Sequence, residues 1–191
     1  AEATIRRCDN IQCKTEFVKA IVPTLVDHWN TFPEDDKSIC TLTECFSDIF
    51  SACGLLLKDF AVSIFNRCLK IIDTNLILFA ATPGDKQDSD FIVASLNLLS
   101  RMTEAFTNSM ESLVGNSNLL GIIYRCTREQ SHRIKLEAFA LLGDLCPYCM
   151  PHIVGNLQAY MSELLKTIAP KPGRASSNAC WALSMIMRYS N

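Results

Sequence analysis

The sequence lacks a long apolar run, since none exceeds six residues and the longest is Leu76–Ala81. About 20 consecutive apolar residues are needed for a helix to cross a bilayer, so no membrane insertion is expected. The first nine residues carry two arginines and no apolar stretch behind them. The sequence therefore predicts neither a signal peptide nor a membrane anchor.

An excess of charge of either sign is also missing. Eighteen Lys and Arg residues stand against 20 Asp and Glu residues, which gives a formal net charge of −2. Proteins that bind nucleic acid through its phosphates present a strongly basic surface, so no direct contact with nucleic acid is expected. No segment alternates apolar and polar residues for long enough to predict a strand. The 49% of hydrophobic residues nevertheless suffices for a sizeable core.

Arrangements of residues typical of catalysis or metal binding are scarce. His28, His132 and His152 are dispersed, no Ser or Cys is placed as a nucleophile, and no phosphate-binding loop is present. The tract Cys146–Cys149 has the spacing of a redox motif, but that chemistry needs a low-pKa thiolate at a helix N-terminus after a strand. With His152 the tract still lacks the second cysteine pair of a zinc site. The sequence therefore predicts no enzyme, no metal site and no cofactor.

Ten cysteines are present in the 191 residues. A disulfide scaffold would be shorter, richer in loops and poorer in apolar residues. Most of the cysteines occupy apolar positions of helical patterns, where a reduced thiol behaves as a small hydrophobic side chain. We therefore expect packing thiols in a reducing compartment, with Cys146 and Cys149 at the exit of one helix and in a short turn.

Apolar residues recur with the period of a helix through almost the whole chain. In Leu42–Cys53, and again in Phe65–Leu76, they stand at i, i+4, i+7 and i+11. Prolines, glycines and acidic residues separate these stripes. The pattern predicts an all-α protein with eight helices, near residues 14–31, 36–53, 55–80, 88–107, 110–128, 131–146, 150–169 and 175–190.

Four of these helices share a pattern of two apolar residues, a Ser or Gly, a variable residue and another apolar residue. The small residues are Ser47, Ser100, Gly143 and Ser184, spaced by 53, 43 and 41 positions. The last two spacings fall within the roughly 40–47 residues of armadillo and HEAT repeats, and a polar insertion near residues 82–88 lengthens the first. The alternative is chance spacing in an apolar-rich helical protein.

The repeat interpretation predicts one HEAT-repeat array over residues 1–191, a right-handed α-α superhelix. Its four helical hairpins are expected at residues 14–53, 55–107, 110–146 and 150–190. Residues 1–13 would be the tail of a truncated repeat. In such a solenoid each hairpin buries its apolar stripe on the next.

An ordered set of segments resembles the transportin (karyopherin beta-2) family of the importin-beta superfamily. The segments are Asp90–Ser100, Ala138–Leu145 and Asn178–Ala182. The Trp29-Asn30 pair, which ends a helix before an acidic turn, is similar as well. The resemblance covers residues 15–191 in continuous order and corresponds to later HEAT repeats of a much longer protein.

The resemblance implies a segment of a nuclear import receptor. In such receptors the inner helices bind basic nuclear localisation signals of the Pro-Tyr type on a concave face, and Ran-GTP releases them. By residue match, the signal contacts fall at Val93, Asn97, Glu104, Asp144, Asn178 and Trp181. The implied partners are cargo proteins, Ran-GTP and the FG repeats of nucleoporins, and the implied location is cytoplasm, nucleus and nuclear pore. A HEAT scaffold that holds two proteins without recognising a signal remains the alternative.

Each assigned residue also has a simpler interpretation. Trp181 in an apolar helix can be a core residue, and Glu104 and Asp144 can be ordinary solvated residues. The chain also departs from the family, which usually has an acidic residue in place of Asn97 and Gly-Glu in place of Ser184-Met185. The loss of two groove carboxylates predicts a weaker attraction for basic peptides.

Overall fold

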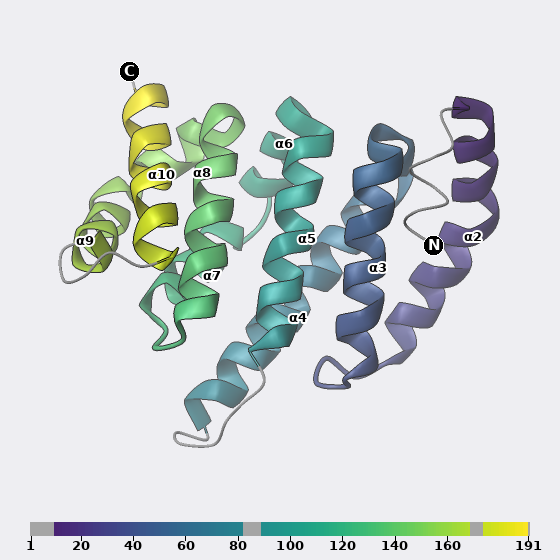
Figure 1. Ribbon diagram of the computed structural model, residues 1–191, viewed down its shortest axis with the longest axis horizontal. Coiled ribbons are helices and arrows are strands. Elements are labelled where there is room, and N and C mark those ends of the chain that lie inside the picture. Colours follow the sequence, from purple (N-terminus) through teal and green to yellow (C-terminus); the bar gives the residue numbers. More distant parts are fainter. Residues whose placement is uncertain (1–9, 82–88, 169–173, 191) are drawn as a thin grey trace.

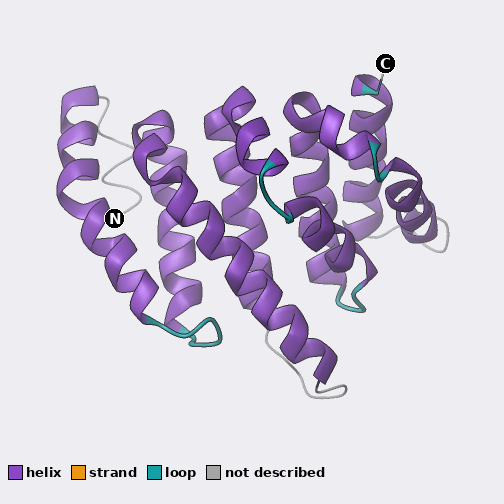
Figure 2. Cartoon of the chain, turned by 180° about the vertical axis from the view of Figure 1, so that it is seen from behind, coloured by secondary structure: helices purple, strands orange, loops and turns teal. Residues whose placement is uncertain are grey.

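The computed structural model describes residues 10–81, 89–168 and 174–190. Over this part of the chain every regular element is a helix, which confirms the predicted all-α class. The helices form a row of hairpins with α2 at one end and α10 at the other (Figure 1), and Figure 2 shows the row from behind. Because the first and last helices lie far apart, the architecture is a HEAT-type solenoid and not a closed bundle.

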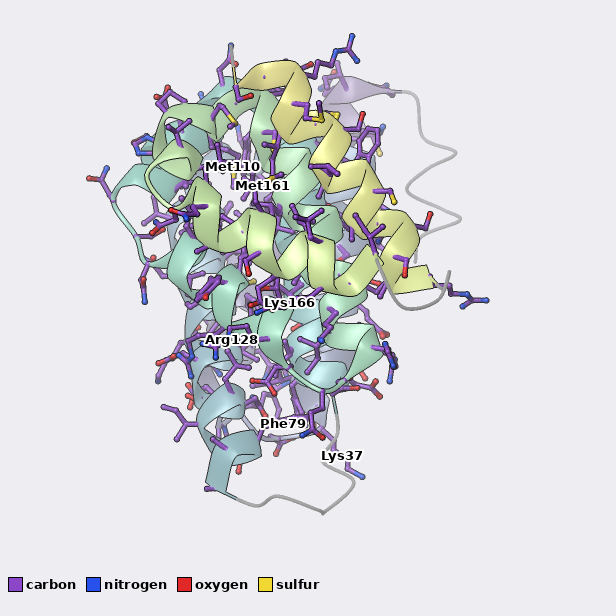
Figure 3. The ribbon with its side chains drawn as sticks, turned by 90° about the vertical axis from the view of Figure 1, so that its left-hand side faces the viewer. Lys37, Phe79, Met110, Arg128, Met161 and Lys166 are labelled. Carbon is purple, nitrogen blue, oxygen red and sulfur yellow. The ribbon has the colours of Figure 1, made fainter. Side chains whose placement is uncertain are left out.

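The helices are arranged in two layers. The inner layer consists of the second helices of the hairpins, which are α3 (Ser38–Cys53), α5 (Asp90–Phe106), α8 (His132–Val154) and α10 (Arg174–Tyr189). The outer layer consists of the first helices, which are α2 (Ile11–Thr31), α4 (Ala61–Ala81), α6 (Met110–Gly115), α7 (Leu119–Arg128) and α9 (Leu157–Ile168). In the inner layer α3 packs on α5, α5 on α8, and α8 on α10. Viewed end-on from α9 and α10, the hairpins lie one behind another (Figure 3).

The core lies between these layers and continues from hairpin to hairpin. Trp29 is fully buried against Phe46, with 4.8 Å between the ring centroids. Phe50 of α3 meets Phe106 of α5 edge to face at 5.4 Å. Burying a large apolar side chain stabilises a fold by about 1.5–3 kcal/mol. The apolar stripes that form the helices therefore also join neighbouring hairpins.

Several predicted helix limits are wrong. The expected helix 55–80 begins as a 3₁₀ segment, η1 (Gly54–Phe60), and the expected helix 110–128 is interrupted between α6 and α7. Residues 11–13 belong to α2, whose first backbone N–H groups donate to the Asn10 side chain, and not to the tail of another repeat. The remainder of that predicted tail, residues 1–9, and the insertion at 82–88 lie outside the described residues.

The largest difference concerns α8, which was expected to end at residue 146 and instead runs to Val154. Pro147 and Pro151 lie inside it, and the backbone accommodates them through the non-helical torsion angles of Cys149, φ −122° and ψ 15°. A proline inside a helix removes one hydrogen bond and can kink the helix without ending it. The predicted helix 150–169 is therefore divided, because its first turn belongs to α8 and α9 begins only at Leu157.

Two connections between hairpins share an unusual backbone geometry. Gly54 ends α3 with φ 51° and ψ −123°, and Thr107 ends α5 with φ 47° and ψ −118°. A 3₁₀ segment follows in both cases, η1 after α3 and η2 (Thr107–Ser109) after α5. Glycine adopts positive φ readily, whereas a β-branched threonine is strained there. The two connections are structurally equivalent although their residues differ.

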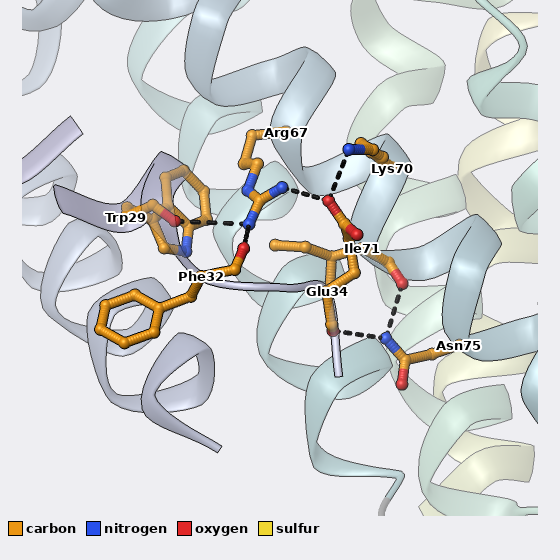
Figure 4. Close-up of polar contacts among 7 residues, drawn as sticks. All are labelled: Trp29, Phe32, Glu34, Arg67, Lys70, Ile71 and Asn75. Atoms are coloured by element: carbon orange, nitrogen blue, oxygen red, sulfur yellow. Dashed lines mark hydrogen bonds and ion pairs between the residues drawn. The ribbon is translucent and has the colours of Figure 1, made fainter. Parts of the chain in front are cut away.

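A polar cluster joins the first hairpin to the second (Figure 4). Arg67 of α4 is only 8% exposed, and it donates to the backbone carbonyl oxygens of Trp29 at 3.3 Å and Phe32 at 2.5 Å. Its guanidinium also pairs with the carboxylate of Glu34, and Asn75 donates to the Glu34 carbonyl oxygen at 2.9 Å. The turn that closes one hairpin is therefore held by a helix of the next.

Candidate functional site

The exposed side of the inner layer contains a hollow of about 510 Å³ between α3, α5 and α8. We call it the α3–α5 hollow. Its lining residues are Glu44, Ser47, Asp48, Ser51, Asp90, Val93, Ala94, Asn97, Arg101 and Arg133. Of the six sequence-predicted site residues, Val93 and Asn97 lie here, one helical turn apart on α5. The other four lie elsewhere on α5, α8 and α10.

The two walls of the α3–α5 hollow differ in charge. On the α5 and α8 side, Arg101 pairs with Glu104 at 2.9 Å and Arg133 pairs with Asp90 at 2.5 Å. Both arginines are thus compensated within the chain. On the α3 side stand Glu44 and Asp48, and within the described ranges no ion pair involves either carboxylate. The hollow therefore has an excess of negative charge.

Residue matching to the family did not assign Glu44 and Asp48. Their spacing of four positions on a predicted helix is the signal that could have found them, because residues at i and i+4 share one face. Two acidic residues at this spacing repel each other slightly. A cationic group between them would relieve that repulsion.

Glu104 lies on α5 beyond the hollow and is exposed. Its carboxylate is already engaged with Arg101 of the preceding turn. An exposed pair of this kind contributes about 0–1 kcal/mol, so it can exchange partners readily. Glu104 is accessible to a ligand, at the expense of a weak internal pair.

Asp144 of α8 is half-buried, and its carboxylate accepts a hydrogen bond from the Ser100 hydroxyl of α5. Burial raises the pKa of Asp144, and the negative charge of Glu104 adds to the rise. The Ser100 hydrogen bond, Arg101 and the Trp181 side chain lower the same pKa without reversing the direction. The Asp144 carboxylate is therefore already engaged across helices.

Trp181 of α10 is 47% exposed, so it is not a core residue buried among leucines. Its indole lies directly on Gly143 of α8, where an added methyl group would stand 2.6 Å from the indole Nε1. The small residue found in the sequence pattern thus marks a place of close helix contact. Asn178, one turn earlier on α10, donates from Nδ2 to the Leu136 backbone carbonyl oxygen at 2.9 Å. Its amide joins α10 to α8.

The structure corrects one expectation about lost carboxylates. Met185 is only 8% exposed, so its side chain points into the core and does not line the exposed face. Only Asn97 remains as a position of that face where an amide replaces the acidic residue expected from the family. The predicted loss of attraction for basic peptides is correspondingly smaller.

The two cysteines of the tract 146–149 are buried inside α8, Cys149 at its kink, and not at a helix exit and in a turn. Burial raises the pKa of both thiols to about 12. Such thiols are protonated near neutral pH and pack as apolar groups, whereas a redox motif needs a thiolate. Among the residues with described positions, no three His, Cys, Asp or Glu side chains are placed to hold a metal ion. No helix in the described ranges is long and apolar enough to cross a membrane.

Comparison with known proteins identifies similar sequences. No family model matches the chain. Transportin-1 of Oryza sativa subsp. japonica is 31% identical over 179 residues, and human transportin-1 is 29% identical over 178 residues; each alignment covers 91% of this chain and 20% of the relative. Importin subunit beta-2 of Saccharomyces cerevisiae is 27% identical over 183 residues, covering 88% of this chain and 20% of the relative. The chain spans about one fifth of the length of these curated relatives. Over nine tenths of its own length, the chain is similar to one segment of these transportins.

Proposed function

We propose that this chain is a segment of a nuclear import receptor and that the exposed side of its inner layer binds an extended, basic cargo signal. The names of the similar proteins, transportin and importin subunit beta-2, support the receptor assignment. The observation that carries the binding assignment is the pair of uncompensated carboxylates, Glu44 and Asp48, in the α3–α5 hollow.

Charge and shape favour a basic, extended ligand. The hollow is open, and neighbouring inner helices continue the face toward Trp181. A lysine or arginine that pairs with an exposed carboxylate contributes about 0.2–1 kcal/mol, and the face of an exposed indole contributes about 0.5–1 kcal/mol to a cation. Several such contacts in a row are needed for useful affinity, which suits a peptide that crosses several helices. The binding should weaken with salt because exposed charges are screened.

For the complete receptor, we propose the wider cycle that the family resemblance implies. Cargo would be released when Ran-GTP binds, and FG repeats of nucleoporins would carry the receptor through the nuclear pore between cytoplasm and nucleus. We propose no catalytic role for this segment, since the high pKa values of Cys146 and Cys149 disfavour thiolate chemistry.

The proposal is tested by titrating a labelled basic Pro-Tyr peptide against the chain at low and at physiological ionic strength. The expected result is micromolar binding that weakens with salt and that is further weakened by Glu44→Gln combined with Asp48→Asn. Asp27→Asn in α2, an exposed carboxylate of the outer layer, is the matched control and should bind as the unchanged chain does. A peptide with glutamine at every basic position should not bind. Equal binding of both peptides would contradict the proposal, and absence of binding would favour the scaffold alternative.

A further inference from the structure

Asp144 lies where three inner helices meet, with α5 on one side and α10 on the other. We infer that Asp144 is a positioning residue, which holds the indole of Trp181 on the bare backbone of Gly143, and that it is not a partner for a basic cargo side chain. The positioning role concerns the chain alone. Its consequence for cargo rests on the proposed function.

The Asp144 carboxylate lies between groups from α5 and α10. The Ser100 hydroxyl of α5 donates to Asp144, and the indole Nε1 of Trp181 from α10 lies on Gly143, the residue next to Asp144, where the indole lowers the carboxyl pKa. One half-buried carboxylate thus connects side chains from both neighbouring helices. A charged ligand would have to compete with these two internal donors.

The indole of Trp181 lies in close contact with the backbone of Gly143. A methyl group on Gly143 would stand 2.6 Å from Nε1 and 2.7 Å from Cδ1 of Trp181. It would also stand 3.4 Å from the Cα atom of Ala182, so the backbones of α8 and α10 approach closely here. A real Cβ atom almost never lies within 3 Å of another heavy atom, so only glycine permits the indole to lie this close. The pyrrole edge of the indole therefore lies directly on Gly143, beside Asp144, while nearly half of Trp181 stays exposed.

Confinement of this kind matters for binding. A side chain that is already held in one conformation loses less entropy when a ligand packs on it. The ligand group that suits an exposed indole face is the aliphatic stem or flat guanidinium of a basic residue. In this arrangement Trp181 contacts the ligand, and Asp144, Ser100 and Gly143 keep Trp181 in place.

Two substitutions at Asp144 separate the positioning role from a direct charge contact. In Asp144→Asn the amide oxygen still accepts from the indole, and the Ser100 hydroxyl can accept from the amide nitrogen. The variant therefore keeps both links and removes the charge. Asp144→Ala removes both links. If Asp144 positions Trp181, the Asp144→Asn variant should behave as the native chain and the Asp144→Ala variant should not. If Asp144 contacts a cargo charge directly, both variants should lose affinity.

Acrylamide quenching of tryptophan fluorescence reads out the position of the indole without cargo. Trp29 is fully buried, so the quenched signal comes from Trp181, and Trp181→Phe gives the baseline. We expect quenching to rise in Asp144→Ala and to stay at the native value in Asp144→Asn. Ser100→Ala, which alters only α5, should raise quenching as well. It replaces Asp144→Ala in the test if circular dichroism shows that Asp144→Ala does not fold. Native quenching in both alanine variants would overturn the inference.

Titration with the basic Pro-Tyr peptide then tests the consequence for cargo. Loss of a fixed indole platform should weaken binding about two- to fivefold in Asp144→Ala, which corresponds to about 0.5–1 kcal/mol for an exposed cation–π contact. Asp144→Asn should bind as the native chain does. An equal loss in both variants would assign Asp144 to direct charge contact and overturn the inference. If the native chain binds no peptide, the proposed function fails, and quenching still decides the positioning role.

Discussion

Replacing Thr107 by glycine is expected to stabilise the chain. Thr107 has φ 47° and ψ −118°, a conformation that Gly54 adopts at the equivalent connection. A residue other than glycine in such a sparsely populated region costs about 1–3 kcal/mol. About 0.5–1 kcal/mol of this gain is lost, because glycine has greater conformational freedom in the unfolded chain. The net stabilisation should be about 0.5–2 kcal/mol, and few packing contacts are lost because Thr107 is exposed.

The reverse change, Gly54→Thr, should destabilise the chain by about 1–3 kcal/mol. Apart from the two neighbouring residues, no atom lies within 4 Å of a Cβ placed on Gly54, so the loss should report mainly the backbone torsion. The two substitutions form a matched pair with opposite expected signs. They test whether the two connections are equivalent.

Thermal unfolding followed by circular dichroism measures both effects. For a chain of this size, 1 kcal/mol shifts the melting temperature by about 2–4 °C. Thr41→Gly is the control, since Thr41 is exposed inside α3, where glycine lowers helix stability by a few tenths of a kcal/mol. If Thr107→Gly lowers the melting temperature as Thr41→Gly does, the assignment of strain to Thr107 is refuted.

Two further predictions concern a carboxylate and the thiols. The hydrogen bond from Lys70 and the positive charge of Arg67 hold the pKa of Glu34 below its usual value. The ionised carboxylate therefore stabilises the fold above its unfolded-state pKa, and this stabilisation is lost as the pH falls through the lower, folded-state pKa. Glu34→Gln should therefore lower the free energy of unfolding at neutral pH and flatten its dependence on acid pH, as measured by urea unfolding. A pH profile equal to that of the native chain would contradict this role of Glu34. A pulse of iodoacetamide should alkylate the exposed Cys180 in the native chain and spare the buried Cys146 until the chain unfolds. Mass spectrometry locates the label, and equal labelling rates would contradict the burial of Cys146.

The apolar stripes were sufficient to predict the class and the layered arrangement, because burial in a helical array follows the helix period. Phe46, for example, lies in the predicted stripe of Leu42–Cys53 and meets Trp29 in the core. The course of α8 could not be predicted, since Pro147 is a helix breaker by local propensity and only tertiary packing keeps the two halves continuous. Nor does any local pattern indicate that Thr107 adopts a glycine conformation.

The sequence was sufficient to predict which helices carry the candidate site, but not which of its residues contact one another. Matching to the family selected positions on α5, α8 and α10, and the helix period places several of them on one side. The hydrogen bond between Ser100 and Asp144 joins residues 44 positions apart, and no spacing rule in a single sequence reveals it. The same holds for the contact between Gly143 and Trp181, although the recurrent small residue pointed to close packing at that position. Glu44 and Asp48 were missed because none of the matched positions lies on α3.

The Arg67 cluster is expected to stiffen the junction between the first two hairpins. A change in the angle between the first two hairpins would break hydrogen bonds of a buried guanidinium, and a buried donor or acceptor left without a partner costs about 1–3 kcal/mol. Between α5 and α8 the polar links include the hydrogen bond of Ser100 to Asp144 and the exposed pair of Arg133 with Asp90, and an exposed pair contributes little. The turn of the first hairpin and helix α4 are therefore expected to move together when the curvature of the array changes.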